Sequence, residues 1–183
     1  MSHATPSEIH DHVYGFRASA HVPSCADCLR LSEAVAAIYA SPLRRAAQTA
    51  DRIAGAYNLP VIHDPDLREI SLGKWEGMTV AEIQAATPGR YEQWLEDPLT
   101  FPAPGGEDLR AFERRVVGTL HRMQKAHPKA DLIVVSHGGV IKTLLCFALG
   151  LDVRSLFRLK QDNTAVSQIE LDGRVRRVLL LND

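Results

Sequence analysis

The chain has 183 residues, of which 45% are hydrophobic, so we expect one domain over residues 1–183 with a substantial core. A net charge of −1 gives no electrostatic case for nucleic acid or an anionic membrane as a partner, so any anion site needs a local group of Arg and His side chains. No apolar stretch approaches the length of a transmembrane helix, no signal-peptide core follows Met1, and the three cysteines are an odd number. These features predict a cytoplasmic protein.

Strand and helix patterns alternate along the chain, which predicts an α/β fold. In chain order we expect a strand at 35–40, a helix at 43–57, a short strand at 61–62, a helix that opens with a capping box of Thr79 and Glu82 and runs to 86, a loop at 98–106, a helix at 108–127, a strand at 132–135, a helix at 140–149 and a hairpin of 165–171 with 174–181. The pair Asp172-Gly173, favoured in type I′ turns, is expected to join the hairpin strands. The predicted architecture is a single-domain three-layer α/β/α sandwich with a mostly parallel sheet.

One turn between a buried strand and a helix carries a histidine. The β-branched run at 132–135 ends in Ser136-His137-Gly138-Gly139, where the glycines allow a tight turn into the helix that follows. Ligands of open α/β sheets bind at the carboxyl ends of strands, and free N–H groups at a helix start favour an anion. A lone histidine at a strand end is more often structural, but the glycine pair and the helix start favour a phosphate or carboxylate site.

Two further segments have patterns that suit a polar site. At 41–50 a second strand end enters a helix, with Arg44 and Arg45 in its first turn. Adjacent helical side chains point about 100° apart, so we expect at most one of the two arginines to face a site; two solvated arginines are the alternative. The loop at 67–78 contains two glycines, a tryptophan and two glutamates, which favours an ordered, close-fitting segment.

Two patterns resemble metal or redox sites only superficially. Cys25 and Cys28 have the spacing of a redox or zinc pair, and His10 and His12 have that of a metal-ligand pair. Neither pattern is accompanied by the second set of ligands that such a site needs. We therefore expect no metal site at either place.

Together, the three polar segments resemble the histidine phosphatase superfamily, the phosphoglycerate-mutase-like proteins, from about residue 36 to the C-terminus. Segment 41–46 is similar to the family's second arginine motif, which implies that Arg45 contacts the phosphate. The loop 67–77 is similar to the family's acid-bearing loop and implies that Glu69 is the proton donor. We expect Trp75 and Glu76 to be structural or to support the residues of the site. Pro104-Gly105-Gly106-Glu107 resembles the loop that enters the long helix, and Ser136-His137-Gly138-Gly139 resembles the second histidine motif.

The N-terminus departs from the family's pattern. The family begins with a core strand that ends in Arg-His-Gly or Arg-His-Ala, and that histidine takes the phosphoryl group. His3 is the candidate here, but Ser2 stands in place of the arginine and no strand pattern precedes it. Tyr14-Gly15 falls where a phosphate-loop glycine is expected, and Arg17 is the candidate for the missing positive charge. Either the natural chain starts upstream of Met1, or the protein has lost part of its site.

The resemblance implies a phosphomonoesterase that acts on a small phosphorylated metabolite with no metal or other cofactor. His3 would attack phosphorus, and Glu69 would protonate the leaving oxygen and then deprotonate the water that hydrolyses phosphohistidine. Arg45, His137 and backbone N–H groups near Gly138 would stabilise the negative charge of the transition state. The sequence leaves a homodimer open.

Three alternatives remain at this point. A mutase must hold a phosphorylated intermediate away from water, and family mutases close the site with C-terminal residues beyond the hairpin, so a chain that ends at Asp183 favours a phosphatase. A phospho-ligand-binding protein that keeps Arg45 and His137 without a competent nucleophile is favoured by Ser2. An acyl hydrolase with 136–139 as its oxyanion loop would need a Gly-x-Ser-x-Gly elbow, which the chain lacks.

Overall fold

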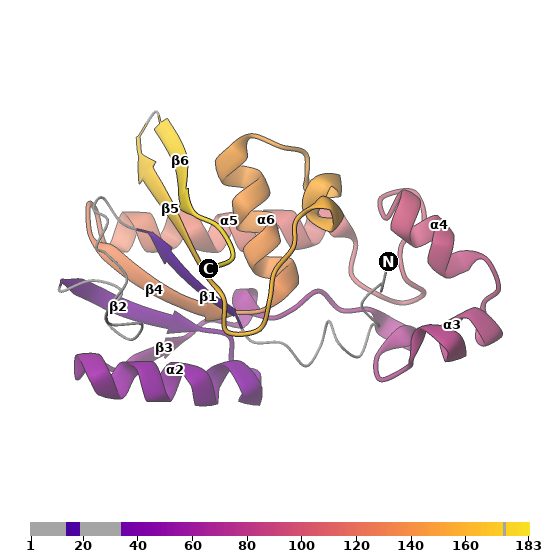
Figure 1. The fold of residues 1–183 in the computed structure, drawn as a ribbon, viewed down its shortest axis with the longest axis horizontal. Helices are drawn as coiled ribbons and strands as arrows, with labels where there is room; N and C mark the ends of the chain where they lie inside the picture. The colour runs from indigo at the N-terminus through magenta and orange to yellow at the C-terminus, as the bar shows by residue number, and fades with distance from the viewer. Residues whose placement is uncertain (1–13, 19–33, 174) are drawn as a thin grey trace.

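The computed structural model describes residues 14–18, 34–173 and 175–183 (Figure 1). Its strands are β1 (Tyr14–Ala18), β2 (Val35–Ala40), β3 (Val61–His63), β4 (Asp131–Ser136), β5 (Val166–Asp172) and β6 (Val175–Leu180). Its helices are α2 (Arg44–Tyr57), α3 (Val80–Ala86), α4 (Arg90–Glu96), α5 (Leu109–Ala126) and α6 (Gly138–Leu149), with 3₁₀ helices η1 (Pro65–Leu67), η2 (Gly73–Trp75) and η3 (Val153–Arg158). Every helix and strand predicted between residues 35 and 181 is present.

The described strands form one sheet in the order β3-β2-β4-β1-β5-β6. β2 pairs in parallel with β3 and with β4, and β1 pairs in parallel with β5, whereas the β1–β4 and β5–β6 pairs are antiparallel. Parallel pairs are the majority, as predicted. Because β2 and β4 are parallel neighbours, their carboxyl ends, at Ala40 and Ser136, lie at the same edge of the sheet.

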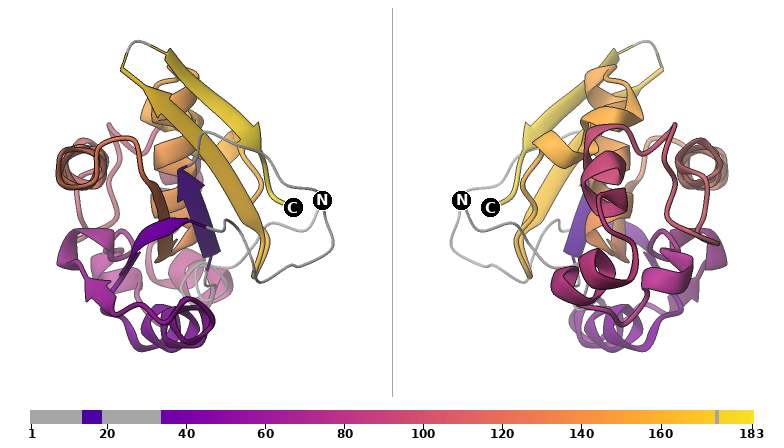
Figure 2. Two further views of the ribbon diagram at one scale, coloured as in Figure 1. Left: turned by 90° about the vertical axis from the view of Figure 1, so that its left-hand side faces the viewer. Right: turned by 90° about the vertical axis from the view of Figure 1, so that its right-hand side faces the viewer.

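Helices cover both faces of this sheet, which is why β4 reads as an unbroken apolar run. Leu132 and Val134 pack into the core under α5 and α6, while the alternate residues Ile133 and Val135 pack against α2. Seen from the side, α2 lies on one face and α5 and α6 on the other (Figure 2). The three-layer α/β/α arrangement is confirmed.

A third hydrophobic cluster lies away from the sheet, around α3 and α4. Its buried members are Leu72, Trp75, Ile83, Tyr91, Trp94 and Ala103. The Trp75 ring meets Tyr91 and Trp94 edge-on, with centroid separations of 6.1 and 5.9 Å. The capping box of Thr79 and Glu82 at the start of α3 is confirmed. The local sequence pattern does not predict α4, which has seven residues and follows Gly89 in the left-handed conformation.

Two loops meet beside this third cluster through their backbones. The N–H of Lys74 donates to the carbonyl of Pro104 (3.0 Å), and the N–H of Glu107 donates to the carbonyl of Ser71 (2.8 Å). Gly73 has a φ of 57°, and a Cβ at this position would overlap the backbone of Gly105. The loop junction therefore needs glycine at position 73.

Two local predictions are wrong. Asp172 still pairs with Val175, so the hairpin loop begins at Gly173 rather than at Asp172. Tyr14-Gly15, expected in a phosphate loop, lies in β1, where Gly15 pairs with residues of β4 and β5. In both places strand pairing includes residues whose local preference is for a turn, because cross-strand hydrogen bonds override that preference.

Candidate active site

The carboxyl ends of β2 and β4 are joined by two buried polar side chains. Ser41 follows β2, and His137 follows β4 as the N-cap residue of α6. The Ser41 hydroxyl and Nε2 of His137 share a hydrogen bond of 2.8 Å, and neither residue is exposed. His137 thus lies where the sequence predicts, at a strand end and a helix start. Its bond to Ser41 was missed, although both residues follow apolar strand patterns.

The two arginines in the first turn of α2 have different surroundings. Arg44 is exposed, whereas Arg45 is half-buried. The positive charge of Arg45 interacts with the carboxylate of Glu69. Arg45 is therefore the member of the pair that faces the polar group at the strand ends, in agreement with the expectation that only one would.

Glu69 brings a carboxyl group to the N-terminus of α6. The residue is 5% exposed, and its Oε1 accepts a hydrogen bond from the N–H of Ile70 (2.9 Å) and its Oε2 from that of Gly139 (3.0 Å). Burial raises the pKa of Glu69, while these N–H groups and the charges of Arg45 and Lys142 act in the opposite direction. A carboxyl group under such opposed influences is suited to donating and accepting a proton.

The glycine at position 139 permits this close approach of the carboxyl group. A Cβ at this position would lie well under 3.0 Å from Oε1 of Glu69. Gly138 and Gly139 are both in the first turn of α6, so a tight turn is not the reason for glycine at 139. The sequence predicts that N–H groups near Gly138 bind phosphate. The N–H of Gly139 donates its hydrogen bond to Glu69.

Replacement of Gly139 by alanine is expected to displace the Glu69 carboxyl group and to lower kcat/KM roughly 10²-fold, the size of effect that follows from a misplaced reacting group. Gly55→Ala is the matched control, because Gly55 lies inside α2, where a Cβ would contact nothing outside its own helical turn. That control should keep its activity and gain about 0.5–1 kcal/mol in free energy of unfolding. Full activity in Gly139→Ala would show that the contact with Glu69 is not needed.

A lysine on α6 adds a second positive charge near Glu69. Lys142 is half-buried and lies one turn after Gly138, and helical side chains lean toward the N-terminus, where Glu69 is bound. Burial lowers the pKa of Lys142, and the attraction of Glu69 opposes this. Lys142 was not among the predicted site residues, although its spacing from Gly138 places it on the same helix face.

The raised pKa of Glu69 also predicts a pH dependence of stability. A carboxyl group that binds its proton more tightly in the folded state favours folding below its unfolded pKa of about 4.5, and this contribution is lost as the pH rises through the folded value. The free energy of unfolding of the parent should therefore fall relative to that of Glu69→Gln as the pH rises from 4.5. Urea unfolding of both proteins at a series of pH values measures this difference. A difference that does not change with pH would contradict the raised pKa.

Several sequence-predicted residues lie outside the described residues. They are His3, His10, His12, Cys25 and Cys28. The backbone of Arg17 lies in β1 and pairs with Ile133, three residues before the end of β4, so the structure does not bring it to the strand ends where His137 lies. Within 34–173 and 175–183, no group of three or more His, Cys, Asp or Glu side chains is placed to hold a metal ion. No helix in the described part of the chain is long and apolar enough to cross a membrane.

Trp75 is buried in the third cluster, and Glu76 is exposed and accepts a hydrogen bond from the Ser71 hydroxyl.

Comparison with known proteins identifies the family. The sequence profile of the histidine phosphatase superfamily (branch 1) matches residues 22–183. The chain belongs to the histidine phosphatase superfamily. Phosphoserine phosphatase 1 of Hydrogenobacter thermophilus is 37% identical over 145 residues, which are 79% of this chain and 69% of that protein.

Solved structures agree with this assignment. YhfR of Bacillus stearothermophilus has a TM-score of 0.77 at 26% identity, over 93% of this histidine phosphatase chain and 97% of its own. Mycobacterial glucosyl-3-phosphoglycerate phosphatase Rv2419c has a TM-score of 0.73 at 25% identity, over 93% of this chain and 98% of its own. The predicted family and α/β fold are confirmed, and the relatives place the chain among phosphatases. His3 and Arg17 precede the matched residues, so their roles depend on the motif resemblance alone.

Proposed function

We propose that this histidine phosphatase is a phosphomonoesterase that hydrolyses a small phosphate ester through a phosphohistidine intermediate. One observation carries the proposal: the buried carboxyl group of Glu69 is bonded to the first turn of α6, directly after His137. Because burial raises the pKa of Glu69, the group suits the delivery of a proton to a leaving oxygen. His137 and the half-buried Arg45 suit the stabilisation of a phosphoryl group.

In the proposed reaction His3 is the nucleophile. Its neutral imidazole forms a bond to phosphorus as the bond from phosphorus to the ester oxygen breaks, and Glu69 gives its proton to that oxygen. Water then attacks the phosphohistidine, Glu69 takes a proton from the water, and the nitrogen–phosphorus bond breaks to release phosphate. The groups proposed to hold the phosphoryl oxygens are Arg45, His137 and the N–H of Gly138. Arg17 is not included, because its backbone pairs with Ile133, three residues before Ser136 at the strand end.

The proposed substrate is a small phosphorylated metabolite. The relatives compared above are named for different phosphate esters, which supports the class of substrate and not one ester. An imidazole, a guanidinium group and a carboxyl group supply the nucleophile, the charge stabilisation and the proton, so the proposed reaction needs no cofactor. Because the net charge is −1, we propose neither nucleic acid nor a membrane as a partner. The odd number of cysteines supports the cytoplasm as the proposed location.

Hydrolysis of p-nitrophenyl phosphate in the presence of a chelator tests the proposal. We expect turnover to continue. When the reaction of a phosphate-labelled substrate is quenched rapidly without acid, we expect the labelled phosphoryl group to be found on His3. His3→Ala should lose both the label and the turnover, while His10→Ala, a histidine of the same N-terminal segment, should keep them. Turnover that needs a divalent metal, or that labels no histidine, would overturn this mechanism.

Ser2 favours a second candidate function, a protein that binds a phosphorylated ligand without hydrolysing it. The family has an arginine at this place, and its loss would weaken the stabilisation of the transition state more than that of the bound ligand. In that case calorimetry would detect phosphate binding that Arg45→Ala abolishes, while no ester is hydrolysed and no label is trapped on His3.

A further inference from the structure

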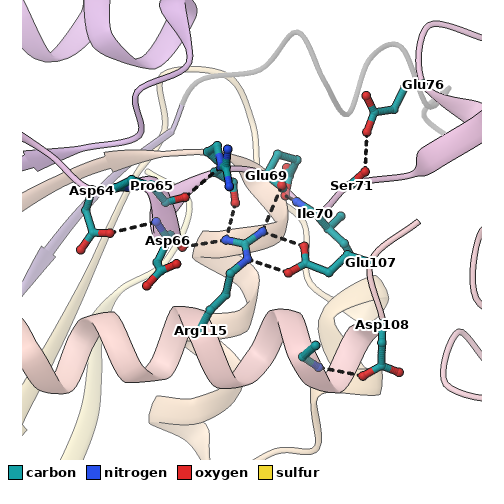
Figure 3. Close-up of polar contacts among 12 residues, drawn as sticks. Asp64, Pro65, Asp66, Glu69, Ile70, Ser71, Glu76, Glu107, Asp108 and Arg115 are labelled. Carbon is teal, nitrogen blue, oxygen red and sulfur yellow. Dashed lines mark hydrogen bonds and ion pairs between the residues drawn. The ribbon is translucent and has the colours of Figure 1, made fainter. Parts of the chain in front are cut away.

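The guanidinium group of Arg115, on α5, lies beside the backbone that leads into Glu69 (Figure 3). Its Nη1 donates hydrogen bonds to the carbonyl oxygens of Asp66 (2.7 Å) and Arg68 (2.8 Å). Its Nη2 donates to the carbonyl oxygen of Glu69 itself (3.1 Å). One side chain of α5 thus binds three carbonyl groups within four consecutive residues of the acid loop.

The same guanidinium group forms a two-pronged ion pair with Glu107. Nε lies 2.7 Å from Oε1 and Nη2 lies 2.8 Å from Oε2 of that carboxylate. Together with the three carbonyl contacts, these bonds use all five N–H donors of Arg115. The guanidinium carbon also lies 4.7 Å from the centre of the Phe112 ring, which fixes the plane of the group. A lysine could not reproduce this arrangement, since its ammonium group has three donors and no planar fork.

Glu69 is therefore held from two sides. Its backbone is bonded to Arg115 on α5, and its carboxyl group is bonded to Gly139 on α6. The two helices pack together in the main core, so the contacts fix the position of the carboxyl group relative to His137.

Stability alone is a weak reason for this arrangement. The side chains of Arg115 and Glu107 are 19% and 21% exposed, so water screens part of their attraction. The position of the Glu69 carboxyl group matters more, because a shift of about 1 Å in a reacting group can lower the rate roughly 10²-fold. We propose that Arg115 and Glu107 are positioning residues for the reaction, which hold the backbone of Glu69 so that its carboxyl group reaches the leaving oxygen.

The test compares Arg115→Lys with the parent on an alkyl phosphate and on p-nitrophenyl phosphate. A misplaced proton donor should lower kcat for the alkyl ester by roughly 10- to 100-fold with little change in KM. The loss should be smaller for p-nitrophenyl phosphate, whose leaving group hardly needs a proton. Glu107→Gln should show the same pattern more weakly, because the glutamine oxygen still accepts one of the two hydrogen bonds from Arg115.

Arg122→Lys is the matched control. Arg122 lies two turns further along α5, and its ion pairs are with the side chains of Asp64 and Asp66, in the same segment that Arg115 binds. Because these pairs are more exposed and do not involve the backbone of Glu69, both esters should be hydrolysed within about twofold of the parent rate. Equal losses for the two esters in Arg115→Lys would overturn the proposal.

Amide hydrogen exchange gives a second measurement that does not depend on turnover. Arg115→Lys should speed exchange at the N–H groups of Ile70 and Gly139, which bind the Glu69 carboxyl group, by roughly tenfold, while amides of β4 keep their parent rates. Unchanged exchange at Ile70 and Gly139, or an equal increase at all amides, would overturn the positioning role.

The inference rests on the proposed role of Glu69 as the proton donor, and the two can fail separately. If Glu69→Gln itself slows both esters equally, the proposed function of Glu69 fails, and hydrogen exchange alone then decides whether Arg115 positions it. If Glu69→Gln slows the alkyl ester selectively and Arg115→Lys does not, the positioning role fails.

Discussion

Glu69→Gln is expected to slow hydrolysis of alkyl phosphates by roughly 10²- to 10⁴-fold, the usual contribution of a positioned proton donor. The loss should shrink with p-nitrophenyl phosphate as substrate, since p-nitrophenolate leaves almost without a proton. Phosphate should still bind, with an inhibition constant equal to or lower than that of the parent, because the substitution removes a carboxylate that repels it. Steady-state kinetics on a series of esters with leaving groups of increasing pKa measure the effect.

The substitution also changes one hydrogen bond, and this needs a control. Both oxygens of Glu69 accept backbone N–H groups, from Ile70 and Gly139, whereas glutamine has one oxygen to offer. Unfolding measurements on the same samples separate this local cost from the loss of the proton. Glu76→Gln, the same change at an exposed glutamate of the same loop, should leave turnover within about twofold. Equal losses for all leaving groups would mean that Glu69 shapes the pocket without donating a proton.

Arg45→Ala is expected to lower kcat/KM by roughly 10²-fold or more, the usual effect of removing one group that stabilises transition-state charge. The pKa of Glu69 should also rise further, because the positive charge of Arg45 holds it down in the parent. Kinetics over a range of pH and competition by inorganic phosphate measure the two effects.

Arg44→Ala provides the internal comparison, since it removes the neighbouring arginine of the same helical turn. Arg44 is exposed, and a positive charge at a helix N-terminus opposes the helix dipole, so its loss should leave activity and stability close to the parent values. His137→Ala should show a loss similar to that of Arg45→Ala, whereas a fully active His137→Ala variant would rule out the proposed site.

Local sequence patterns predicted the elements that carry the site, because each part has a strong local signal. The apolar run of β4, the alanine-rich face of α2 and the capping box of α3 each depend on residues close together in the chain. The geometry of one helical turn predicted that at most one of Arg44 and Arg45 faces the site, and the family's motif was needed to choose Arg45. The identification of Glu69 as an acid needed the family's motif, since a glutamate in a loop has no local pattern of its own.

Contacts between distant residues could not be predicted in this way. The bond between Ser41 and His137 joins two strand ends, and the bond between Glu69 and Gly139 joins a loop to a helix start. Arg115 looks like one of several charged residues on an amphipathic helix, and nothing in its neighbours shows that it binds three carbonyl groups of another segment. β1 and α4 are short, and pairing and packing with distant parts of the chain decide their conformation.

The junction beside the third cluster has a consequence for how such a protein can diversify. Its two loops meet backbone to backbone, through two peptide hydrogen bonds and at Gly73 and Gly106, where a Cβ would come too close to the opposite loop. Residues 78–101 share their aromatic core with Trp75 of this junction and with Phe157, while Arg115 and Gly139 hold Glu69 from the other side. A replacement of 78–101 must therefore still cover Trp75 and Phe157, whereas the contacts of Arg115 and Gly139 that hold the acid need not change.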